Sequence, residues 1–206
     1  MATELEERLE ALLAVGEVEE VRRLYDEWAP TYDGEEVAAL LGHAGPERVA
    51  ARVADLVDPR ADVLDAGCGT GLVGAALAAR GFGSLDGLDL SRGMIRRARR
   101  RRVYHDLGPA DLRHGVPGAR AKFGVVTCVG ALIPGHLGPG ALTGFARATV
   151  AGGYVVAAIP ENTWVEGGYD AQVAALAEQG YASPVAGADG PDPEGPGRLL
   201  VLQVPR

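Results

Sequence analysis

The pattern of apolar and polar residues changes along the chain. The first sixty residues carry apolar side chains at helical spacing, whereas later segments hold short apolar runs bounded by glycine, proline and acidic residues. The first pattern predicts amphipathic helices, and the second predicts strands that are buried on both faces. We expect one helix with apolar positions Leu5, Leu9, Leu12 and Leu13, a second with Val18, Val21, Leu24 and Tyr25, and a third over residues 45–57.

Seven short apolar runs follow, and helical stretches separate most of them. This alternation predicts a doubly wound α/β domain. Residues 161–180, between the fifth and sixth runs, leave room for one helix, which we place over residues 167–179. Residues 187–197 are rich in Gly, Pro and Asp and predict the loop of a terminal hairpin. The runs include residues 63–64, 85–89, 103–107, 123–132, 153–159, 181–186 and 198–204.

The first predicted strand leads directly into a glycine-rich turn. Residues 63–71 read Val-Leu-Asp-Ala-Gly-Cys-Gly-Thr-Gly, and a helical stretch follows. Without Cβ atoms, this backbone can lie against a ligand at the carboxyl end of a parallel strand. A dinucleotide site needs a glycine where this chain has Leu72, and Asp65 suits a cation better than a pyrophosphate. The turn therefore predicts a cationic ligand. A nicotinamide-dependent oxidoreductase and a turn without a ligand are the alternatives.

An acid stands at the end of the second predicted strand. Asp89 lies 18 residues after Gly71, close to the distance of about 20 residues at which an acid accepts both ribose hydroxyls of a bound nucleoside. Ser91 follows it and can cap the next helix. Asp86 is the alternative, but it lies inside the apolar run.

The glycine turn resembles motif I of the class I S-adenosylmethionine-dependent methyltransferases, and Asp89 matches the acid after their second strand. The resemblance implies an α/β, Rossmann-like fold with a seven-stranded, mostly parallel sheet in the order 3-2-1-4-5-7-6. It also implies an antiparallel C-terminal hairpin, helices on both faces, S-adenosylmethionine (SAM) as cofactor and S-adenosylhomocysteine (SAH) as product. The chain departs from the family at Gly124, where an acid is usual.

The resemblance assigns further residues to the cofactor. The residue at Met94 packs against the adenine in this family, and an acid after the third strand accepts a hydrogen bond from the adenine amino group. Asp111 is our choice for that acid, with Asp106 as the alternative. The predicted cofactor-binding residues are Asp65, Ala66, Gly67, Gly69, Gly71, Asp89, Leu90, Met94, Asp111, Leu112, Val129, Tyr25 and Tyr32.

Three aromatic residues cluster in residues 25–33, Tyr-Asp-Glu-Trp-Ala-Pro-Thr-Tyr-Asp, although the protein is only 5% aromatic. The segment resembles a signature before motif I of many small-molecule methyltransferases, where N-terminal segments fold over the cofactor. Tyr25, Trp28 and Tyr32 are thus predicted to form a lid, and packing between helices is the alternative. We expect residues 1–60 to form a helical cap on the same domain as a SAM-binding core of residues 61–206.

The acceptor is predicted less directly. The class implies in-line attack of a nucleophile on the sulfonium methyl, for which a neutral amine needs no base and a hydroxyl needs one. His136 and Glu161, after the fourth and fifth strands, are the candidate bases. The chain most resembles the methyltransferase-like group with the Williams-Beuren region protein and bacterial peptide N-methyltransferases. That implies an amine of a small natural product or peptide as acceptor. The predicted acceptor-binding residues are Trp28, Tyr32, His136 and Trp164.

Two alternative functions remain open at this point. One is O-methylation of a small molecule, with His136 or Glu161 as the base. The other is a protein that binds SAM or a nucleoside without catalysis, since such a protein would keep the same glycine turn and Asp89. N-methylation, O-methylation and binding without catalysis all predict that the protein binds SAM, and titration with SAM and with SAH tests this.

Composition and charge narrow the partners. The 206 residues, of which 47% are apolar, suffice for one domain with a sizeable core. The net charge of −8 argues against nucleic acid as a substrate, and the arginines of residues 96–102 are expected to form a solvated face at a helix C-terminus.

No metal is predicted, because the four histidines are scattered and the two cysteines, Cys68 and Cys128, fall where the sheet should be buried. No run is long enough to span a membrane, and the N-terminus lacks the basic and apolar regions of a signal peptide. We expect a cytoplasmic protein that is a monomer or a weak homodimer.

Overall fold

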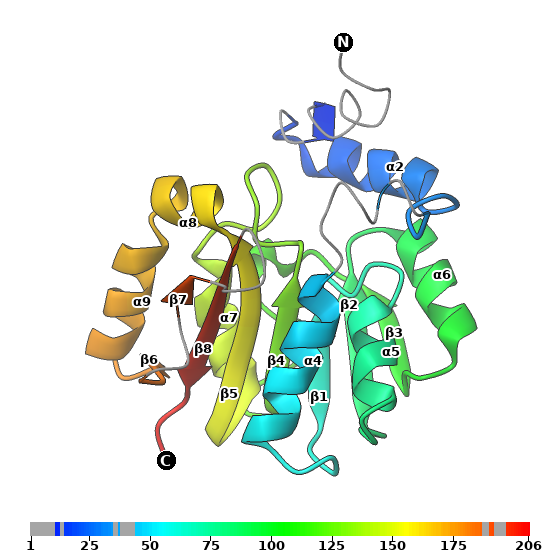
Figure 1. Cartoon of the computed structure of the whole chain (residues 1–206). Coiled ribbons are helices and arrows are strands. Elements are labelled where there is room, and N and C mark those ends of the chain that lie inside the picture. Colours follow the sequence, from blue (N-terminus) through cyan, green and yellow to red (C-terminus); the bar gives the residue numbers. More distant parts are fainter. Residues whose placement is uncertain (1–10, 13–14, 35–36, 38–43, 187–189, 192–196) are drawn as a thin grey trace.

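The computed structural model describes residues 11–12, 15–34, 37, 44–186, 190–191 and 197–206 (Figure 1). Most of the first predicted helix, including Leu5, Leu9 and Leu13, lies outside these residues, as does most of the predicted hairpin loop of residues 187–197. Leu12 is described and is buried.

The sheet has eight strands along the path β3-β2-β1-β4-β5-β8-β6, with β7 paired to β8. The first five strands pair in parallel, and β8 runs antiparallel to its neighbours. When the two-residue β7 is left out of the count, β8 is the seventh strand along the chain. The order is then the predicted 3-2-1-4-5-7-6, so the fold prediction is confirmed. The two-residue β7 lies within the predicted loop. The strands are β1 Val63–Ala66, β2 Leu85–Asp89, β3 Asp106–Pro109, β4 Phe123–Val129, β5 Thr149–Pro160, β6 Ser183–Pro184, β7 Gly190–Pro191 and β8 Gly197–Gln203.

Helices cover both faces of the sheet, as predicted. In Figure 1, α4 and α5 lie in front of the strands and α7 lies behind them, while α2 sits at the upper end of the sheet beside α6. The described helices are α2 Val18–Trp28, α4 Ala44–Leu56, α5 Leu72–Ala78, α6 Arg92–Arg101, α7 Ala141–Ala148, α8 Glu161–Gly167 and α9 Tyr169–Glu178, with the short 3-10 helix η1 Leu112–His114.

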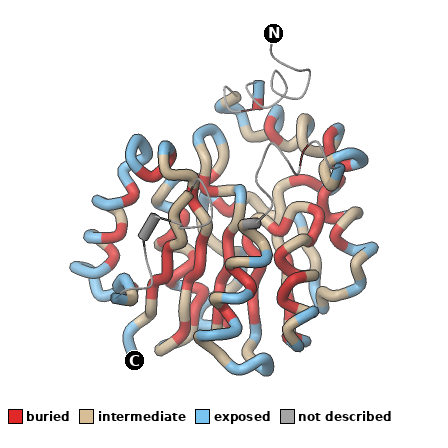
Figure 2. The backbone as a smooth tube through the Cα atoms, viewed as in Figure 1, coloured by how far each residue is buried: buried red, intermediate tan, exposed pale blue. Residues whose placement is uncertain are grey.

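Two apolar clusters hold these layers together, one on each face. Val125 of β4 packs in the cluster under α4 and α5, and its neighbour Val126 packs in the cluster under α7. Successive strand residues point to opposite faces, so a continuous apolar run buries side chains on both. The interior strands are accordingly buried along most of their length (Figure 2).

The parallel pairing brings the ends of the predicted strands to one edge of the sheet. Ala66 of β1 pairs with Leu88 of β2, and Asp65 pairs with Thr127 of β4. The glycine turn, Asp89 and the residues after β4 therefore emerge side by side at the carboxyl edge. Open α/β sheets bind ligands at this edge.

Two predictions about the helices need correction. The helix expected over residues 167–179 corresponds to α9, but it is not the only helix in residues 161–180: α8 precedes it, and the two meet at Gly168, where φ is +74°. Glu161, expected in a loop, therefore starts a helix. The third N-terminal helix, α4, begins and ends within one residue of its prediction, but it packs on the sheet against α5 and β5. Among the described residues, α2 is the main helix above the sheet edge. No helix in the described part of the chain is long and apolar enough to cross a membrane.

Candidate cofactor and acceptor site

A cavity of about 320 Å³ lies at the carboxyl edge of the sheet, beneath α2. One side, called the cofactor side below, is lined by the glycine turn and by residues that follow β2 and β3. The other, called the acceptor side, is lined by the aromatic rings of residues 25–32 and by the loop after β4. The structure thus brings most of the predicted site residues together. Those that line the cavity are Gly67, Gly69, Asp89, Leu90, Met94, Asp111, Leu112, Val129, Tyr25, Trp28, Tyr32 and His136.

Five predicted residues lie elsewhere. Among the described residues, the cavity lining does not include Asp65, Ala66 or Gly71, which are buried behind the glycine turn, nor Glu161 or Trp164. Trp164 stacks on Tyr169 and donates its indole N–H to Asp170, so it belongs to the packing of α8 and α9. Glu161 accepts hydrogen bonds from Arg198. Arg198 itself lines the cavity.

The glycine turn has a backbone that a side chain would disturb. Gly67 has a φ of +73°, and a Cβ there would come within 2.7 Å of the Ala131 Cβ. Gly69, with a φ of +52°, lines the cavity, and a Cβ there would meet no described atom within 4 Å. Gly67 therefore permits close packing against the loop after β4, and Gly69 leaves room in the cavity for a ligand.

The N–H groups of the glycine turn are largely used within the protein. Gly67 and Cys68 both donate to the Leu88 carbonyl, at 2.8 and 3.0 Å, and Gly71 donates to the Cys68 carbonyl at 2.8 Å. Gly69 donates to the Asp89 carboxylate at 2.8 Å. A pyrophosphate site needs N–H groups that point at the ligand. This turn instead presents a carboxylate beside an apolar wall, which fits a cationic nucleoside.

Asp89 is the carboxylate at the centre of the cofactor side. Its two oxygens accept N–H groups from Gly69 and Ser91, each at 2.8 Å. Burial raises the pKa of Asp89 to about 6, and these two hydrogen bonds oppose that rise. Asp86, the alternative, pairs with Lys122 at 2.7 Å on an exposed edge and is not a lining residue among those described. Asp89, and not Asp86, therefore lines the cavity.

Met94 and Asp111, the two residues predicted to contact the adenine, both line the cavity. Met94 lines the cavity and is 2% exposed, and its flexible thioether is suited to pack against a ring. Asp111 lines the cavity and is held by Arg113, with N–O distances of 2.9 to 3.2 Å, which lowers the pKa of its carboxyl. Asp106, the alternative, is exposed at the start of β3 and lies outside the lining as described.

Two aspartates that the sequence analysis did not single out attach residues 25–33 to the core. The Asp26 carboxylate accepts the Ser91 hydroxyl at 2.7 Å and the Gly93 N–H at 2.6 Å, at the start of α6. The Asp33 carboxylate accepts the Thr70 hydroxyl, within the glycine turn, at 2.5 Å. Each aspartate directly follows an aromatic residue, so the repeated Tyr-Asp pair was the available signal.

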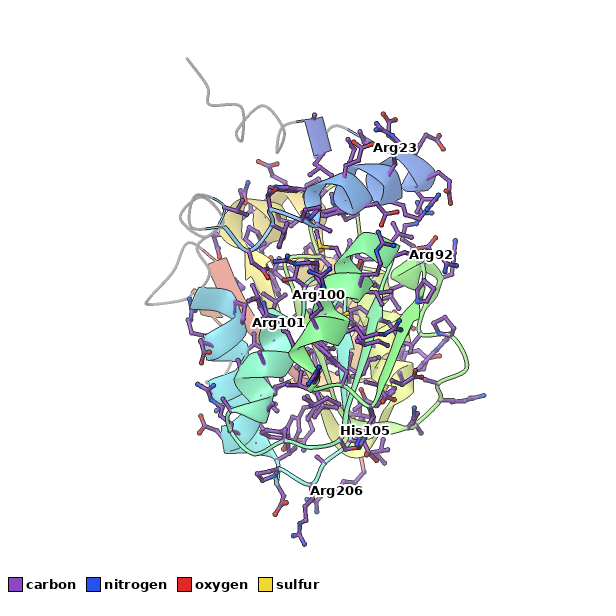
Figure 3. The ribbon with its side chains drawn as sticks, turned by 90° about the vertical axis from the view of Figure 1, so that its right-hand side faces the viewer. Arg23, Arg92, Arg100, Arg101, His105 and Arg206 are labelled. Atoms are coloured by element: carbon purple, nitrogen blue, oxygen red, sulfur yellow. The ribbon has the colours of Figure 1, made fainter. Side chains whose placement is uncertain are left out.

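The arginines of α6 do not all form a solvated face. Arg97 and Arg101 reach Asp33 at 3.4 and 3.0 Å, and Arg101 also donates to the Thr70 carbonyl at 2.7 Å. Figure 3 looks onto α6, with Arg92, Arg100 and Arg101 labelled and Arg23 on the neighbouring α2. Arg92 and Arg100 are exposed, as predicted for this helix. Part of the basic cluster therefore holds the N-terminal segment in place.

Aromatic rings form the acceptor side. Tyr25 stacks near Trp28 at 6.1 Å between ring centroids, and Trp28 meets Tyr32 edge-on at 5.0 Å. The His136 ring lies edge-on to Tyr25 at 5.3 Å. Trp28 is 1% exposed, so it both lines the cavity and packs inside the N-terminal segment. The segment therefore has the position expected of a lid, and it also packs against its neighbours as the alternative prediction stated.

His136 has a defined tautomer. Its Nδ1 lies 3.0 Å from the Pro134 carbonyl, which can only accept, so Nδ1 carries the proton and Nε2 carries a lone pair. Nε2 is buried and makes no hydrogen bond to any described residue. Burial lowers the pKa of His136, and the Pro134 carbonyl opposes this. A neutral imidazole with an unpaired acceptor favours a hydrogen-bond donor beside it, because an unsatisfied buried lone pair is costly. No cluster of three metal-ligating side chains occurs in the described part of the chain.

The fold is that of the class I SAM-dependent methyltransferases, and the site resembles their cofactor site. The family described as a methyltransferase domain matches residues 63–153, which run from β1 into β5. The match supports the predicted class and SAM as the cofactor.

Among curated proteins, the chain is 36% identical over 137 residues to methyltransferase-like protein 27 of Homo sapiens, covering 65% of this chain and 56% of that protein. It is 45% identical over 100 residues to the malonyl-[acyl-carrier protein] O-methyltransferase of Methylovorus sp. (strain MP688), covering 47% of this chain and 32% of that protein. The chain thus spans about half or less of the length of these relatives.

Solved structures share the fold. Magnesium protoporphyrin IX methyltransferase of Synechocystis PCC 6803, solved with bound SAM, has a TM-score of 0.67 and 19% identity over 90% of this chain and 96% of its own. DhpI, solved with SAH, has a TM-score of 0.67 and 22% identity over 92% of this chain and 97% of its own. At these identities the likeness concerns the fold alone.

Proposed function

We propose that the protein transfers a methyl group from SAM to an acceptor that enters the cavity beneath α2. When bound, SAM supplies a methyl group activated on a sulfonium. The glycine turn and Asp89 hold the nucleoside, and the apolar wall with Met94 receives the adenine. The rings of Tyr25 and Tyr32 exclude water on the acceptor side. Alignment and water exclusion of this kind lower a transfer barrier by roughly 7–11 kcal/mol.

We propose an amine of a small natural product or of a peptide as the acceptor. The cavity volume of about 320 Å³ lies at the lower end of the range of roughly 300–1,000 Å³ for ligand pockets. Only a small molecule, or the reactive end of a larger one, therefore fits beside the cofactor. The aromatic rings of the acceptor side also favour a cationic group, because the face of an aromatic ring attracts positive charge.

The observation that carries this proposal is the buried Nε2 lone pair of His136. A protonated amine cannot attack a methyl group, so it must first lose a proton. His136 is held neutral by burial, and its free acceptor atom is placed to take that proton once the acceptor lies against Tyr25. Glu161 is engaged by Arg198, which leaves His136 as the better placed base.

A hydroxyl acceptor is the second candidate, and the same lone pair supports it. A neutral hydroxyl needs a base even more than an amine does, since its pKa is far higher than the pKa of the imidazole. Methylation on oxygen is also what the name of the Methylovorus relative describes. The cytoplasmic location and the monomeric or weakly dimeric state expected from the sequence belong to this proposal as well.

A matched pair of acceptors separates the two candidates. Methyl-labelled SAM is incubated with 2-phenylethylamine and, separately, with 2-phenylethanol, and the product mass is measured. We expect methyl on the amine. The His136→Gln variant should lower kcat about 100-fold at pH 7 and less at pH 9.5, where more of the amine is already neutral, with the SAM Kd unchanged within twofold.

Each other outcome has a meaning. Methyl only on the alcohol would replace the amine with the hydroxyl candidate. SAM binding without methylation of either compound, or of a peptide with a free N-terminus, would favour a binding protein without catalysis. Failure of SAM and SAH to bind in calorimetry would overturn the proposal as a whole.

A further inference from the structure

Tyr104 occupies a space that three glycines leave open. It lies between the end of α6 and the start of β3, and its ring fits against the back of the glycine turn. A Cβ at Gly74 would come within 2.3 Å of its hydroxyl oxygen, and Cβ atoms at Gly71 and Gly87 would each lie 3.1 Å from its ring carbons. These three positions belong to the glycine turn, α5 and β2. The ring therefore fills a gap between three elements that carry the cofactor side.

The Tyr104 hydroxyl donates a hydrogen bond to the Asp65 carboxylate at 2.6 Å. That distance is typical of a hydroxyl that donates to a charged oxygen. Asp65 is 2% exposed and lies on β1, directly before the glycine turn. Burial raises the pKa of Tyr104 far above its usual range, so the phenol stays protonated and remains a donor.

Asp65 in turn supports the start of α5. The N–H of Gly74, the third residue of that helix, lies close enough to the Asp65 carboxylate to lower its pKa. Gly71 stands at the N-cap position, where it has no side chain to accept such a group. A carboxylate at a helix N-terminus satisfies an N–H and opposes the positive end of the helix dipole. Asp65 thus lies on β1 close to the first turn of α5, and the glycine turn connects these two elements.

We propose that Tyr104 is a positioning residue for the cofactor: through Asp65, its hydroxyl holds the glycine turn in the shape that receives SAM. Asp65 then acts behind the turn, because its carboxylate accepts hydrogen bonds from Tyr104 and Thr127, and Asp65 is not among the described residues that line the cavity. The inference rests on SAM binding at this turn, which is part of the proposed function.

Tyr104→Phe tests the proposal, because it keeps the ring between the glycines and removes only the hydroxyl. SAM is titrated by calorimetry at several pH values between 5.5 and 8. The variant should bind SAM about tenfold more weakly at pH 7.5, since a buried carboxylate loses its donor. SAM affinity should decline at acidic pH, where Asp65 gains a proton. In the variant this decline should begin at a higher pH, because loss of the hydrogen bond raises the pKa of Asp65. Tyr154→Phe is the control, as its hydroxyl contacts Gln203 at 2.9 Å away from the cavity lining.

A second variant and a second measurement separate positioning from packing. In an Asp65→Asn background, the further change Tyr104→Phe should alter SAM affinity less than twofold, because the two residues act as one unit. Hydrogen exchange without ligand should be faster in residues 67–74 of Tyr104→Phe than in the wild type, which is a readout independent of SAM.

The proposal is overturned if Tyr104→Phe matches the wild type in affinity, pH profile and exchange. It is also overturned if the affinity loss persists undiminished in the Asp65→Asn background. If the wild type itself fails to bind SAM while the exchange result appears as expected, the proposed function fails and the support of the turn by Tyr104 stands.

Discussion

The two sides of the cavity are built in different ways. The cofactor side comes from residues 67–111, whose lining residues stand at a strand end, in the turn after it or in the first turn of the following helix. Its shape depends on backbone hydrogen bonds and on positive φ values. The acceptor side joins α2, the loop after β4 and the ends of β5 and β8, and its shape depends on packed side chains.

Because the two sides are built differently, we expect SAM binding and the choice of the methyl acceptor to depend on different residues. A change in the cofactor side disturbs the turn and the sheet edge together, because the same N–H groups serve both. A change among Tyr25, Tyr32 and His136 leaves the sheet hydrogen bonds untouched. We therefore expect substitutions on the cofactor side to alter SAM affinity and stability, and substitutions on the acceptor side to alter turnover.

The largest expected effect tests whether a side-chain charge dominates the cofactor side. Asp89→Asn removes the charge and leaves one good acceptor atom for the two N–H groups of Gly69 and Ser91. SAM affinity should fall about 100-fold, or roughly 3 kcal/mol, as measured by calorimetry. Asp86→Asn, three residues earlier on the same strand, should change it less than twofold. Equal affinities in the two variants would show that Asp89 does not carry the binding.

A pH series distinguishes the buried charges of the two sides. Burial raises the pKa of Asp65 from 3.8 to about 6, so the folded state holds this proton more tightly than the unfolded chain. Its contribution to the free energy of unfolding is greatest below pH 3.8 and is lost as the pH rises through about 6. Between pH 4 and 7.5, the wild type should lose roughly 2–3 kcal/mol relative to Asp65→Asn in urea unfolding.

His136, on the acceptor side, should behave in the opposite sense. Burial lowers its pKa, so the wild type should gain stability relative to His136→Gln as the pH rises through the titration range of an ordinary histidine. Asp55→Asn, on the exposed side of α4, serves as the control for both series. A stability difference between wild type and Asp65→Asn that stays constant with pH would contradict the buried charge.

Gly67→Ala tests whether backbone geometry holds the turn. The substitution forces an alanine into a φ of +73° and places its Cβ against Ala131. The free energy of unfolding should fall by about 2 kcal/mol. Gly81→Ala has a comparable φ of +90° but a nearest contact of 3.9 Å, so it should cost about 1 kcal/mol. If both variants lose the same amount, close packing against Ala131 contributes nothing.

The smallest effect concerns the link between the two sides. Asp33→Asn weakens the contacts to Thr70 and Arg101 that hold residues 25–33 over the cavity. Hydrogen exchange in that segment should become faster, and SAM should bind about fivefold more weakly, as expected for one charged hydrogen bond at a partly exposed position. Glu27→Gln, an exposed residue of the same segment, is the control. Unchanged exchange would show that Asp33 does not anchor the segment.

Local patterns carried most of the predicted cofactor side. The glycines at alternate positions, Asp89 at a strand end and the apolar runs each act through nearby residues, and the structure places them as expected. The helix predicted over residues 167–179 matches α9 within two residues, but α8, which begins at Glu161 and ends before Gly168, was not predicted. Trp164 and Glu161 follow a strand end as His136 does, but only His136 lines the cavity.

The sequence by itself determined the places of the strands along the chain, the glycine turn and the acid at the end of the second strand, because these depend on residue type at short spacing. The tertiary structure alone decided which distant side chains meet. Tyr104 reaches Asp65 across 39 residues, Asp33 reaches Thr70 across 37, and Asp26 reaches Ser91 across 65. No spacing rule predicts such pairs, since they form only when the packed sheet and helices bring both residues of each pair to the same edge of the sheet.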